Sequence, residues 1–312
     1  MKFTSKIPSN ISPKTTLAQY LAQRFTYHSI GEWNELITNG QVLLNNSKVS
    51  ASSLISAGMI IEYDPGDFEE PDADLNYKII FEDDWFIGIS KPGNLLVHRA
   101  GRSFRNNLIY QLRFVHQPAY KNAHTTHRLD RDTSGVVLIA KTSEARAAIG
   151  LQFAAGEVKK EYIAIVHGIP DSSIERISFP IGKTINSAIS YKYCVDPSGK
   201  EAITIVKSVH RLGESFAELL LQPLTGRTHQ IRIHCAAIGH PIVGDKLYGL
   251  SEEAYLTWRD NPQSVSTGLL FHRHALHCRS LTFFHPYLKR ECTVVADLPE
   301  DMSVLAVSLT TR

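Results

Sequence analysis

The stretch His127-Arg-Leu-Asp-Arg-Asp-Thr-Ser-Gly135 runs directly into Val136-Val-Leu-Ile-Ala140, so a dense polar segment is followed at once by apolar residues. A short continuous apolar run of this kind, rich in β-branched residues, is typical of a buried strand. The sequence therefore predicts a charged loop at the start of a buried strand. Catalytic side chains concentrate in such loops, because a rigid scaffold fixes their positions. A structural alternative stays open, in which the two aspartates only cap backbone amides and pair with the loop arginines.

Other strands and helices are predicted on both sides of this loop. Two strands meet at the acidic turn 82–84, and a Lys-Pro-Gly loop follows at 91–93. Helices and strands do not alternate regularly, so we expect an α+β domain rather than a doubly wound one. The predicted strands span 78–81, 85–90, 136–140, 162–166, 202–206 and 217–222, and the predicted helices span 144–153 and 231–238.

The N-terminal part of the chain has a pattern of its own. Apolar residues at helical spacing predict two short helices, over 17–25 and from Trp33 to the stop at Gly40. Two short strands are predicted about an Asn-Asn turn in 41–49, and a third strand over 58–63. The N-terminal part is therefore predicted to form a small module of mixed helices and strands.

An acidic segment follows this module. Residues 64–74 contain six carboxylates, two prolines and no basic residue, which is typical of a solvated, extended linker. We therefore expect a module over 1–64, a linker over 65–75 and a large domain over 76–312.

Composition places the chain among ordinary globular proteins. Of its 312 residues 43% are hydrophobic and 21% are charged, which allows one large and one small domain. Neither a signal peptide nor an apolar stretch long enough to cross a bilayer is found, so a cytoplasmic location and no membrane partner are expected. The four cysteines are irregularly spaced, which favours reduced buried thiols over disulfides or a zinc site: Cys194, Cys235, Cys278 and Cys292.

Positive charge gathers around the polar loop. Residues 99–146 carry nine lysines and arginines against three carboxylates, although the net charge of the whole chain is only +2. A phosphate backbone is the natural partner for such a surplus, since binding releases counterions. A solvated charged face is the alternative.

A second polar cluster spans 221–234 and begins at a Pro/Thr/Gly turn that leads into a helix. From residue types alone, Arg227 and Arg232 are expected to be surface charges, and His229 and His234 to be hydrogen-bonded structural groups. The histidines of 272–277 have no common zinc spacing, and no phosphate-binding or dinucleotide-binding glycine motif is found. No metal and no organic cofactor is therefore expected.

Taken together, these segments resemble the RluA family of RNA pseudouridine synthases. The resemblance implies a mixed, mostly antiparallel sheet with flanking helices, and an enzyme that isomerises uridine within a structured RNA. The matching segments keep the family order and lie at 81–84 with 91–93, 127–135, 160–168, 221–234, 239–249 and 276–286.

Residues 15–64 are similar to the small S4 RNA-binding module that precedes the catalytic domain in many members. The similarity runs through Ser29, Trp33, Gly40 and Asn45. This module departs from the pattern, because the second helix lacks the usual basic residues.

The resemblance also implies roles for individual residues. Asp130 matches the family nucleophile, and a carboxylate suits a reaction in which the uracil is detached, rotated and rejoined without capture by water. Tyr162 matches a pocket tyrosine that assists proton removal, and Arg227 matches an arginine that pairs with the nucleophile. Arg128 matches the position that fills the gap left by the flipped uridine. The other residues expected to bind substrate or RNA are His127 and Thr133, which support the loop rather than react, and Arg131, Thr228 and His229.

Two other classes of protein remain in competition with this interpretation. A nucleoside or glycoside hydrolase could use a carboxylate at an anomeric carbon, with Asp132 as its second carboxyl group. A non-catalytic RNA-binding protein would need only the module and a basic face. Ribosomal RNA is preferred over transfer RNA as the target, and a monomer is expected. Whether Asp130 attacks C1′ of the sugar or C6 of the base stays open.

Overall fold

The chain divides into two compact units, which are described separately. A computed structural model describes residues 3–25, 27–64, 69–261 and 269–311. The first unit comprises Met1–Pro71 together with Arg99–Arg105, and the second comprises Asp72–His98 and Asn106–Arg312. The grouping of 99–105 with the N-terminal residues was not anticipated from the sequence. Residues 65–68 of the predicted linker lie outside the described part.

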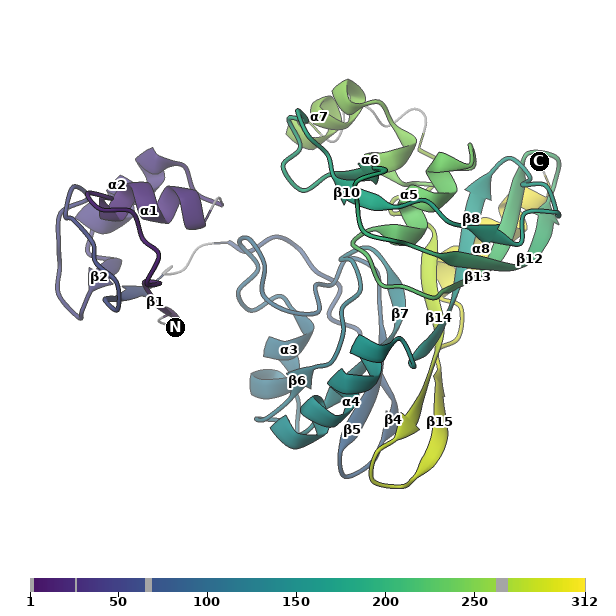
Figure 1. Ribbon diagram of the computed structural model, residues 1–312, viewed down its shortest axis with the longest axis horizontal. Helices are drawn as coiled ribbons and strands as arrows, with labels where there is room; N and C mark the ends of the chain where they lie inside the picture. The colour runs from purple at the N-terminus through teal and green to yellow at the C-terminus, as the bar shows by residue number, and fades with distance from the viewer. Residues whose placement is uncertain (1–2, 26, 65–68, 262–268, 312) are drawn as a thin grey trace. The chain divides into compact units, whose positions relative to one another are not determined.

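The first unit is a three-stranded antiparallel sheet with two helices (Figure 1). Each helix begins with a capping box, Thr16 with Gln19 and Ser29 with Glu32, in which side chain and backbone satisfy each other's free groups. The fully buried Trp33 lies in the core of this unit. The elements are β1 (Phe3–Lys6), α1 (Leu17–Arg24), α2 (Ile30–Thr38), β2 (Val42–Leu44) and β3 (Ile60–Tyr63), in the sheet order β1-β3-β2.

The predicted pair of strands about the Asn-Asn turn is wrong in its second half. After β2 the residues Asn45 and Asn46 both adopt positive φ, 49° and 63°, and the chain turns away with a single bridge between Leu44 and Ser47. The partner of β2 is β3 instead, held beside the turn by the Ile60 N–H, which donates to Asn45 Oδ1 at 2.8 Å. The other helices and strands predicted in this unit are confirmed.

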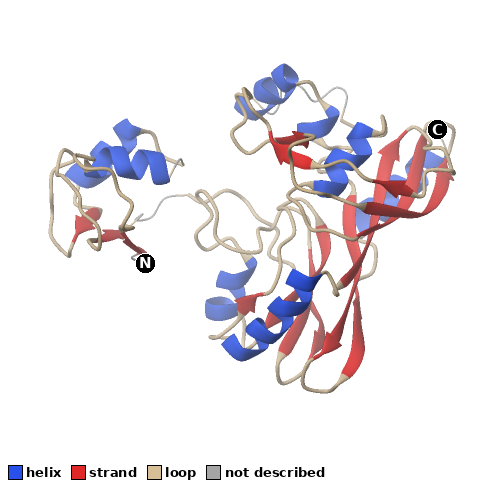
Figure 2. Ribbon diagram, viewed as in Figure 1, coloured by secondary structure: helices blue, strands red, loops and turns tan. Residues whose placement is uncertain are grey.

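The second unit is built on one ten-stranded sheet (Figure 2). Its strands follow the order β4-β5-β7-β14-β8-β13-β12-β9, with β15 added beside β14 and β6 beside β7. All pairs are antiparallel except β7 with β14. The bounds are β4 (Lys78–Glu82), β5 (Phe86–Lys91), β6 (His124–Thr125), β7 (Ser134–Ala140), β8 (Lys159–His167), β9 (Arg176–Ile177), β12 (Thr204–Leu212), β13 (Phe216–Pro223), β14 (Leu276–His285) and β15 (Arg290–Val295).

The strand β7 forms the centre of the core, and every one of its seven residues is buried. Its parallel partner β14 comes so close that a Cβ on Gly135 would lie 2.1 Å from the carbonyl oxygen of Cys278. Gly135 also has a φ of +112°, which side chains rarely adopt. Glycine is therefore required where the polar loop meets the strand.

Helices flank the sheet, and a small two-stranded sheet stands apart from it. The helix α4 packs on β7, while α5 and α8 pack on β12 (Figure 1). The predicted α+β architecture and the predicted helices are confirmed, whereas β14, β15 and α8 were not predicted. The remaining elements are α3 (Leu108–Tyr110), a π-helix η1 (Gln111–Val115), α4 (Ser143–Ala155), β10 (Ile181–Lys183), β11 (Tyr193–Val195), α5 (Gln230–Ala237), α6 (Lys246–Gly249), α7 (Glu252–Asp260) and α8 (Glu300–Thr310).

Within the part of the chain that the structure describes, no helix combines the length and the apolar character that crossing a bilayer requires.

Candidate active site

A cavity of about 680 Å³ opens between the polar loop and the start of α5. This volume lies within the range of small-molecule sites. The loop before β7 contributes 126–130 and Thr133, and the opposite wall comes from 223–232 at the end of β13 and the beginning of α5. The structure thus brings together two clusters that lie about a hundred residues apart in the sequence.

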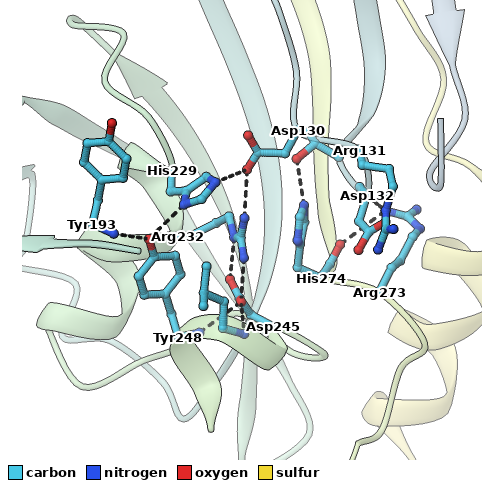
Figure 3. Close-up of polar contacts among 12 residues, drawn as sticks. Asp130, Arg131, Asp132, Tyr193, His229, Arg232, Asp245, Tyr248, Arg273 and His274 are labelled. Carbon is cyan, nitrogen blue, oxygen red and sulfur yellow. Dashed lines mark hydrogen bonds and ion pairs between the residues drawn. The ribbon is translucent and has the colours of Figure 1, made fainter. Parts of the chain in front are cut away.

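An ion pair joins the two walls of this cavity. Arg232 donates from Nη1 to Oδ2 of Asp130 at 2.9 Å (Figure 3). The Asp130 side chain retains 21% exposure, so its carboxylate is paired and still open to the cavity. Such a carboxylate can serve as a nucleophile or a base.

Arg232 is held in turn by a second carboxylate. Its Nε donates to Asp245 Oδ2 at 2.7 Å and its Nη2 donates to Oδ1 at 2.9 Å. Asp245 is fully buried and also caps α6, because Oδ1 accepts the N–H groups of Leu247 and Tyr248. The expectation that Arg232 is a surface charge is wrong: its side chain is 9% exposed, since helix α5 turns it inward. Asp245 lies within 239–249, but its isolated position in the sequence gives no sign of this contact.

The expected pairing of Arg227 with the nucleophile is also wrong. Arg227 precedes α5, and its Nε donates to the backbone carbonyl of Glu201 at 2.8 Å. The backbone N–H of Arg227 donates to Gln230 Oε1 at 3.0 Å, which fixes the turn before the helix. Arg227 lines the cavity as an exposed cation, and Arg232 on the first turn of α5 makes the ion pair.

The electrostatics of the cavity keep Asp130 ionised. Burial raises the pKa of Asp130, but the charges of Arg232 and Arg128 and the hydrogen bond from Arg232, together with His229 when it is protonated at acidic pH, outweigh it and leave the pKa below its usual value. At neutral pH the group is therefore a carboxylate.

His229 faces the same carboxylate oxygen as Arg232. Its Nε2 is 3.9 Å from Asp130 Oδ2, and its Nδ1 is hydrogen-bonded to the hydroxyl of Tyr248 at 2.8 Å. Tyr248 accepts the backbone N–H of Tyr193 at 3.3 Å, so the ring is anchored from β11 (Figure 3). Burial lowers the pKa of His229 to about 4, although Asp130 opposes this shift. His229 is therefore neutral at pH 7.

Tyr162 lines the cavity from β8 and is 8% exposed. Burial raises the pKa of its phenol well above the usual value, and the neighbouring Cys278 and Asp130 add to the shift. The hydroxyl consequently stays protonated at neutral pH. Burial also raises the pKa of Cys278 to about 12, so this neighbour remains a thiol.

Several of the predicted residues hold the polar loop in place. His127 accepts the N–H of Leu138 at Nε2, 3.0 Å away, and its ring stacks on Phe153. Burial lowers the pKa of His127 to about 3, so it acts as a neutral acceptor. The hydroxyl of Thr133 is hydrogen-bonded to Nε2 of His274 at 2.7 Å. These contacts tie the loop to β7 and to the segment that precedes β14.

A second buried arginine supports the far end of the loop. Arg273 donates from Nη1 to the carbonyl of Asp132 at 3.0 Å. Its Nε and Nη2 form a fork on Asp301 of α8, at 2.7 and 3.0 Å. Arg273 thereby connects helix α8 to the polar loop.

Two of the other predicted residues lie at the rim of the site. Arg128 and Thr228 are exposed and line the cavity. Arg131 is exposed and pairs with Asp132 at 3.0 Å, and it does not line the cavity. Arg131 therefore lies outside the cavity, although it follows Asp130 directly in the chain.

No group of three potential metal ligands converges anywhere in the described part of the chain. Ser134 Oγ is hydrogen-bonded to His277 Nδ1 at 3.0 Å, so this histidine, like His274, has a partner in the loop. All four cysteines are free, but the expectation that all are buried is wrong for Cys194 and Cys292, which are partly exposed.

The chain is similar to known proteins over most of its length. Residues 86–237 match the family model described as RNA pseudouridylate synthase. The chain is 34% identical over 305 residues to ribosomal large subunit pseudouridine synthase D of Xylella fastidiosa, covering 93% of this chain and 87% of that protein. It is 28% identical over 298 residues to ribosomal large subunit pseudouridine synthase C of Buchnera aphidicola, covering 92% and 91%.

Solved structures show the same fold. The human protein RNA pseudouridylate synthase domain containing 4 superposes with a TM-score of 0.57 at 26% identity, covering 75% of this chain and 92% of that one. RNA pseudouridylate synthase domain containing 1, also human, gives 0.55 at 25% identity, covering 78% and 98%.

Proposed function

Because the chain belongs to the RNA pseudouridylate synthase family, we propose that it converts uridine to pseudouridine in large-subunit ribosomal RNA, with Asp130 as its nucleophile. The observation that carries this proposal is the carboxylate of Asp130, held ionised by Arg232 while still open to a cavity of about 680 Å³. A cavity of this size accepts a flipped base. The ribosomal target follows the names of the relatives, which are ribosomal large subunit enzymes.

The reaction sets four chemical requirements. The bond from N1 of uracil to C1′ of ribose breaks, a bond from C5 to C1′ forms, C5 loses a proton and N1 gains one. Attack by Asp130 at C1′ or at C6 would begin either route, and both need the ionised carboxylate. Arg232 keeps its charge throughout, because its pKa is raised by the two carboxylates even though burial opposes this.

Tyr162 is proposed to work from the wall of the cavity. Its pKa is raised, so it is a neutral phenol that can donate a hydrogen bond to the base or the sugar. It could take up the C5 proton only after giving up its own. Arg128 is proposed to fill the stack that the flipped uridine leaves, since it is exposed at the rim and has a long side chain.

The N-terminal module, over 1–64 and followed by an acidic linker over 65–75, is proposed to be an S4-like RNA-binding module. The arrangement of two capped helices on a short antiparallel sheet supports this assignment. The catalytic domain over 76–312 is proposed to act as a monomer in the cytoplasm, where ribosomal RNA is made and modified in bacteria such as those of the relatives.

Mapping of pseudouridine in cellular RNA tests the proposal. Total RNA from cells with and without the gene is treated with carbodiimide, and reverse-transcriptase stops are compared site by site. We expect one or a few stops in large-subunit ribosomal RNA to disappear and to return with the wild-type gene but not with Asp130→Asn. Loss of stops only in transfer RNA would contradict the ribosomal target, and an unchanged map would favour a binding role.

Asp132→Asn is the matched control, because Asp132 belongs to the same loop but pairs with Arg131 and does not line the cavity. We expect it to restore the stops. A hydrolase with two catalytic carboxyl groups would lose activity in both variants and would release free uracil, whereas isomerisation leaves the mass of the RNA unchanged.

A further inference from the structure

Lys160 places a positive charge inside the cavity. It lies on β8 two residues before Tyr162, so both side chains leave the strand on the same face, and both line the cavity. The ammonium nitrogen Nζ is 5.9 Å from the centroid of the Phe153 ring. It is 3.8 Å from the position that a Cβ on Gly226 would take, which places it beside the turn before α5.

No carboxylate balances this charge. Among the residues that the structure describes, Lys160 Nζ has neither a hydrogen bond nor an ion pair. The single carboxylate among the cavity residues is Asp130, and it is already paired with Arg232. Burial lowers the pKa of Lys160, which reflects the cost of keeping an unpaired ammonium away from water.

Two more cations without a carboxylate partner stand at the rim of the same cavity. Arg128 and Arg227 line it and are exposed. In the described residues Arg227 Nε is bound to a neutral carbonyl, that of Glu201, and Arg128 pairs with no carboxylate. The cavity therefore carries an excess of positive charge that an anionic substrate would neutralise.

We propose that Lys160 binds a backbone phosphate of the RNA next to the flipped uridine. This inference rests on the proposed function, because an RNA substrate supplies that anion. A phosphate carries a full negative charge, which compensates a partly buried ammonium better than a neutral uracil carbonyl does. Lysine suits this role as a compact point charge at the end of a long stem.

Lys159 offers a matched control. It is the neighbouring residue on β8, so its side chain leaves the opposite face of the strand. It is 62% exposed, lies 3.4 Å from Glu291 and does not line the cavity. Replacing either lysine by methionine removes one positive charge, and only the position differs.

The experiment measures binding and turnover on an in vitro transcript of large-subunit ribosomal RNA that carries tritium at C5 of uridine. Pseudouridine formation expels the C5 hydrogen, so released tritium reports the reaction. We expect Lys160→Met to raise Kd and KM about tenfold and to reduce the slope of log K against log salt by about one. Lys159→Met should leave Kd and KM within about twofold and the slope within a few tenths of the wild-type value. Lys160→Arg, which keeps the charge, should restore the slope.

Stability separates this role from a merely structural one. Because Lys160 is unpaired in the free protein, we expect Lys160→Met to leave Tm unchanged or higher while it weakens RNA binding. A lower Tm with unchanged Kd and slope would overturn the proposal. Loss of kcat with an unchanged slope would also overturn it and would place Lys160 against the base. If the wild-type protein releases no tritium, the proposed function fails, whereas the salt dependence of binding still decides the role of Lys160.

Discussion

Asp245 holds Arg232 by two hydrogen bonds, Nε to Oδ2 at 2.7 Å and Nη2 to Oδ1 at 2.9 Å, and leaves Nη1 free for Asp130. The guanidinium thus bridges a fully buried carboxylate and the one that faces the cavity. A planar fork held on one side presents its remaining N–H group in a fixed direction. The position and the ionisation of the proposed nucleophile both depend on this arrangement.

Replacing Arg232 should affect the reaction far more than replacing Arg227. Arg232→Lys keeps a positive charge but cannot reproduce the two-point fork on Asp245 together with the bond to Asp130, so we expect kcat to fall about a hundredfold. The pKa of Asp130 should rise, because the charge and the hydrogen bond of Arg232 contribute to lowering it against burial and the variant loses the hydrogen bond at this position. Since the carboxylate is the active form, activity should then be lost at a higher pH than in the wild-type protein as the solution is acidified.

Arg227→Lys is the control variant for Arg232→Lys. The acidic side of its pH–rate profile should coincide with that of the wild-type protein. The pH dependence of single-turnover tritium release measures both variants. If the pH at which activity is lost shifted in Arg227→Lys and not in Arg232→Lys, the ion pair between Arg232 and Asp130 would not govern the reaction.

Asp245→Asn should reduce turnover without removing RNA binding. The amide would face the N–H groups of Arg232 with one donor of its own, so the fork would loosen and Nη1 would no longer be aimed at Asp130. We expect kcat to fall about tenfold to a hundredfold while Kd stays within about threefold. Asp260→Asn serves as the control, because Asp260 is 68% exposed at the end of α7 and pairs with Arg259 rather than with a cavity residue. Equal effects in the two variants would contradict the positioning role.

Asp301→Asn should lower stability in a pH-dependent way. Burial raises the pKa of Asp301, but Arg273 and the N–H of Met302 outweigh this and lower it below its usual value. The contribution of Asp301 to stability is therefore complete above the pKa that an aspartate has in the unfolded chain, about 4. It is lost as the pH falls through the lower pKa of Asp301 in the folded protein. We expect the variant to be about 2 kcal/mol less stable at pH 7. The difference in urea unfolding between the two proteins should shrink below pH 4, and a constant difference would contradict the prediction.

Tyr162→Phe should remove chemistry while preserving the fold. The phenol is protonated at neutral pH, and its hydroxyl is proposed to contact the reacting nucleotide. Because the ring still fills the wall of the cavity, we expect Tm within about 2 °C of the wild-type value and kcat at least a hundredfold lower. Tyr191→Phe is a suitable control, since Tyr191 is exposed and its hydroxyl bonds to Tyr255 instead. Retained turnover in Tyr162→Phe would exclude the hydroxyl from the reaction.

Gly135→Ala should prevent the loop and the sheet from forming together. An added Cβ would lie 2.1 Å from the carbonyl oxygen of Cys278, and φ of +112° is strained for alanine. We expect a loss of more than about 3 kcal/mol of stability, measured by denaturant unfolding. Gly150→Ala is the control in α4, where a Cβ would meet nothing within 4 Å, and it should gain about 0.5 to 1 kcal/mol. A small effect at Gly135 would contradict the tight approach of β7 and β14.

Local sequence patterns were enough to predict many of the helices and strands and the loop that forms one wall of the cavity. A polar loop running into five apolar residues predicted the buried strand β7, and the spacing of apolar residues predicted α1, α2, α4 and α5. The motif that contains Asp130 led to the proposal of this residue as the nucleophile. These features are encoded by residues that are neighbours in the chain, so periodicity and turn chemistry suffice to find them.

Only the tertiary structure decided which groups meet. Strand β14 enters the sheet between β7 and β8, and Arg232 rather than Arg227 reaches Asp130. Asp245, thirteen residues beyond Arg232, completes the fork. Such contacts join segments far apart in the chain and depend on the direction in which each helix or strand turns a side chain. The sequence determines which charged residues are present, whereas the packing of the sheet and helices determines which of them come within bonding distance.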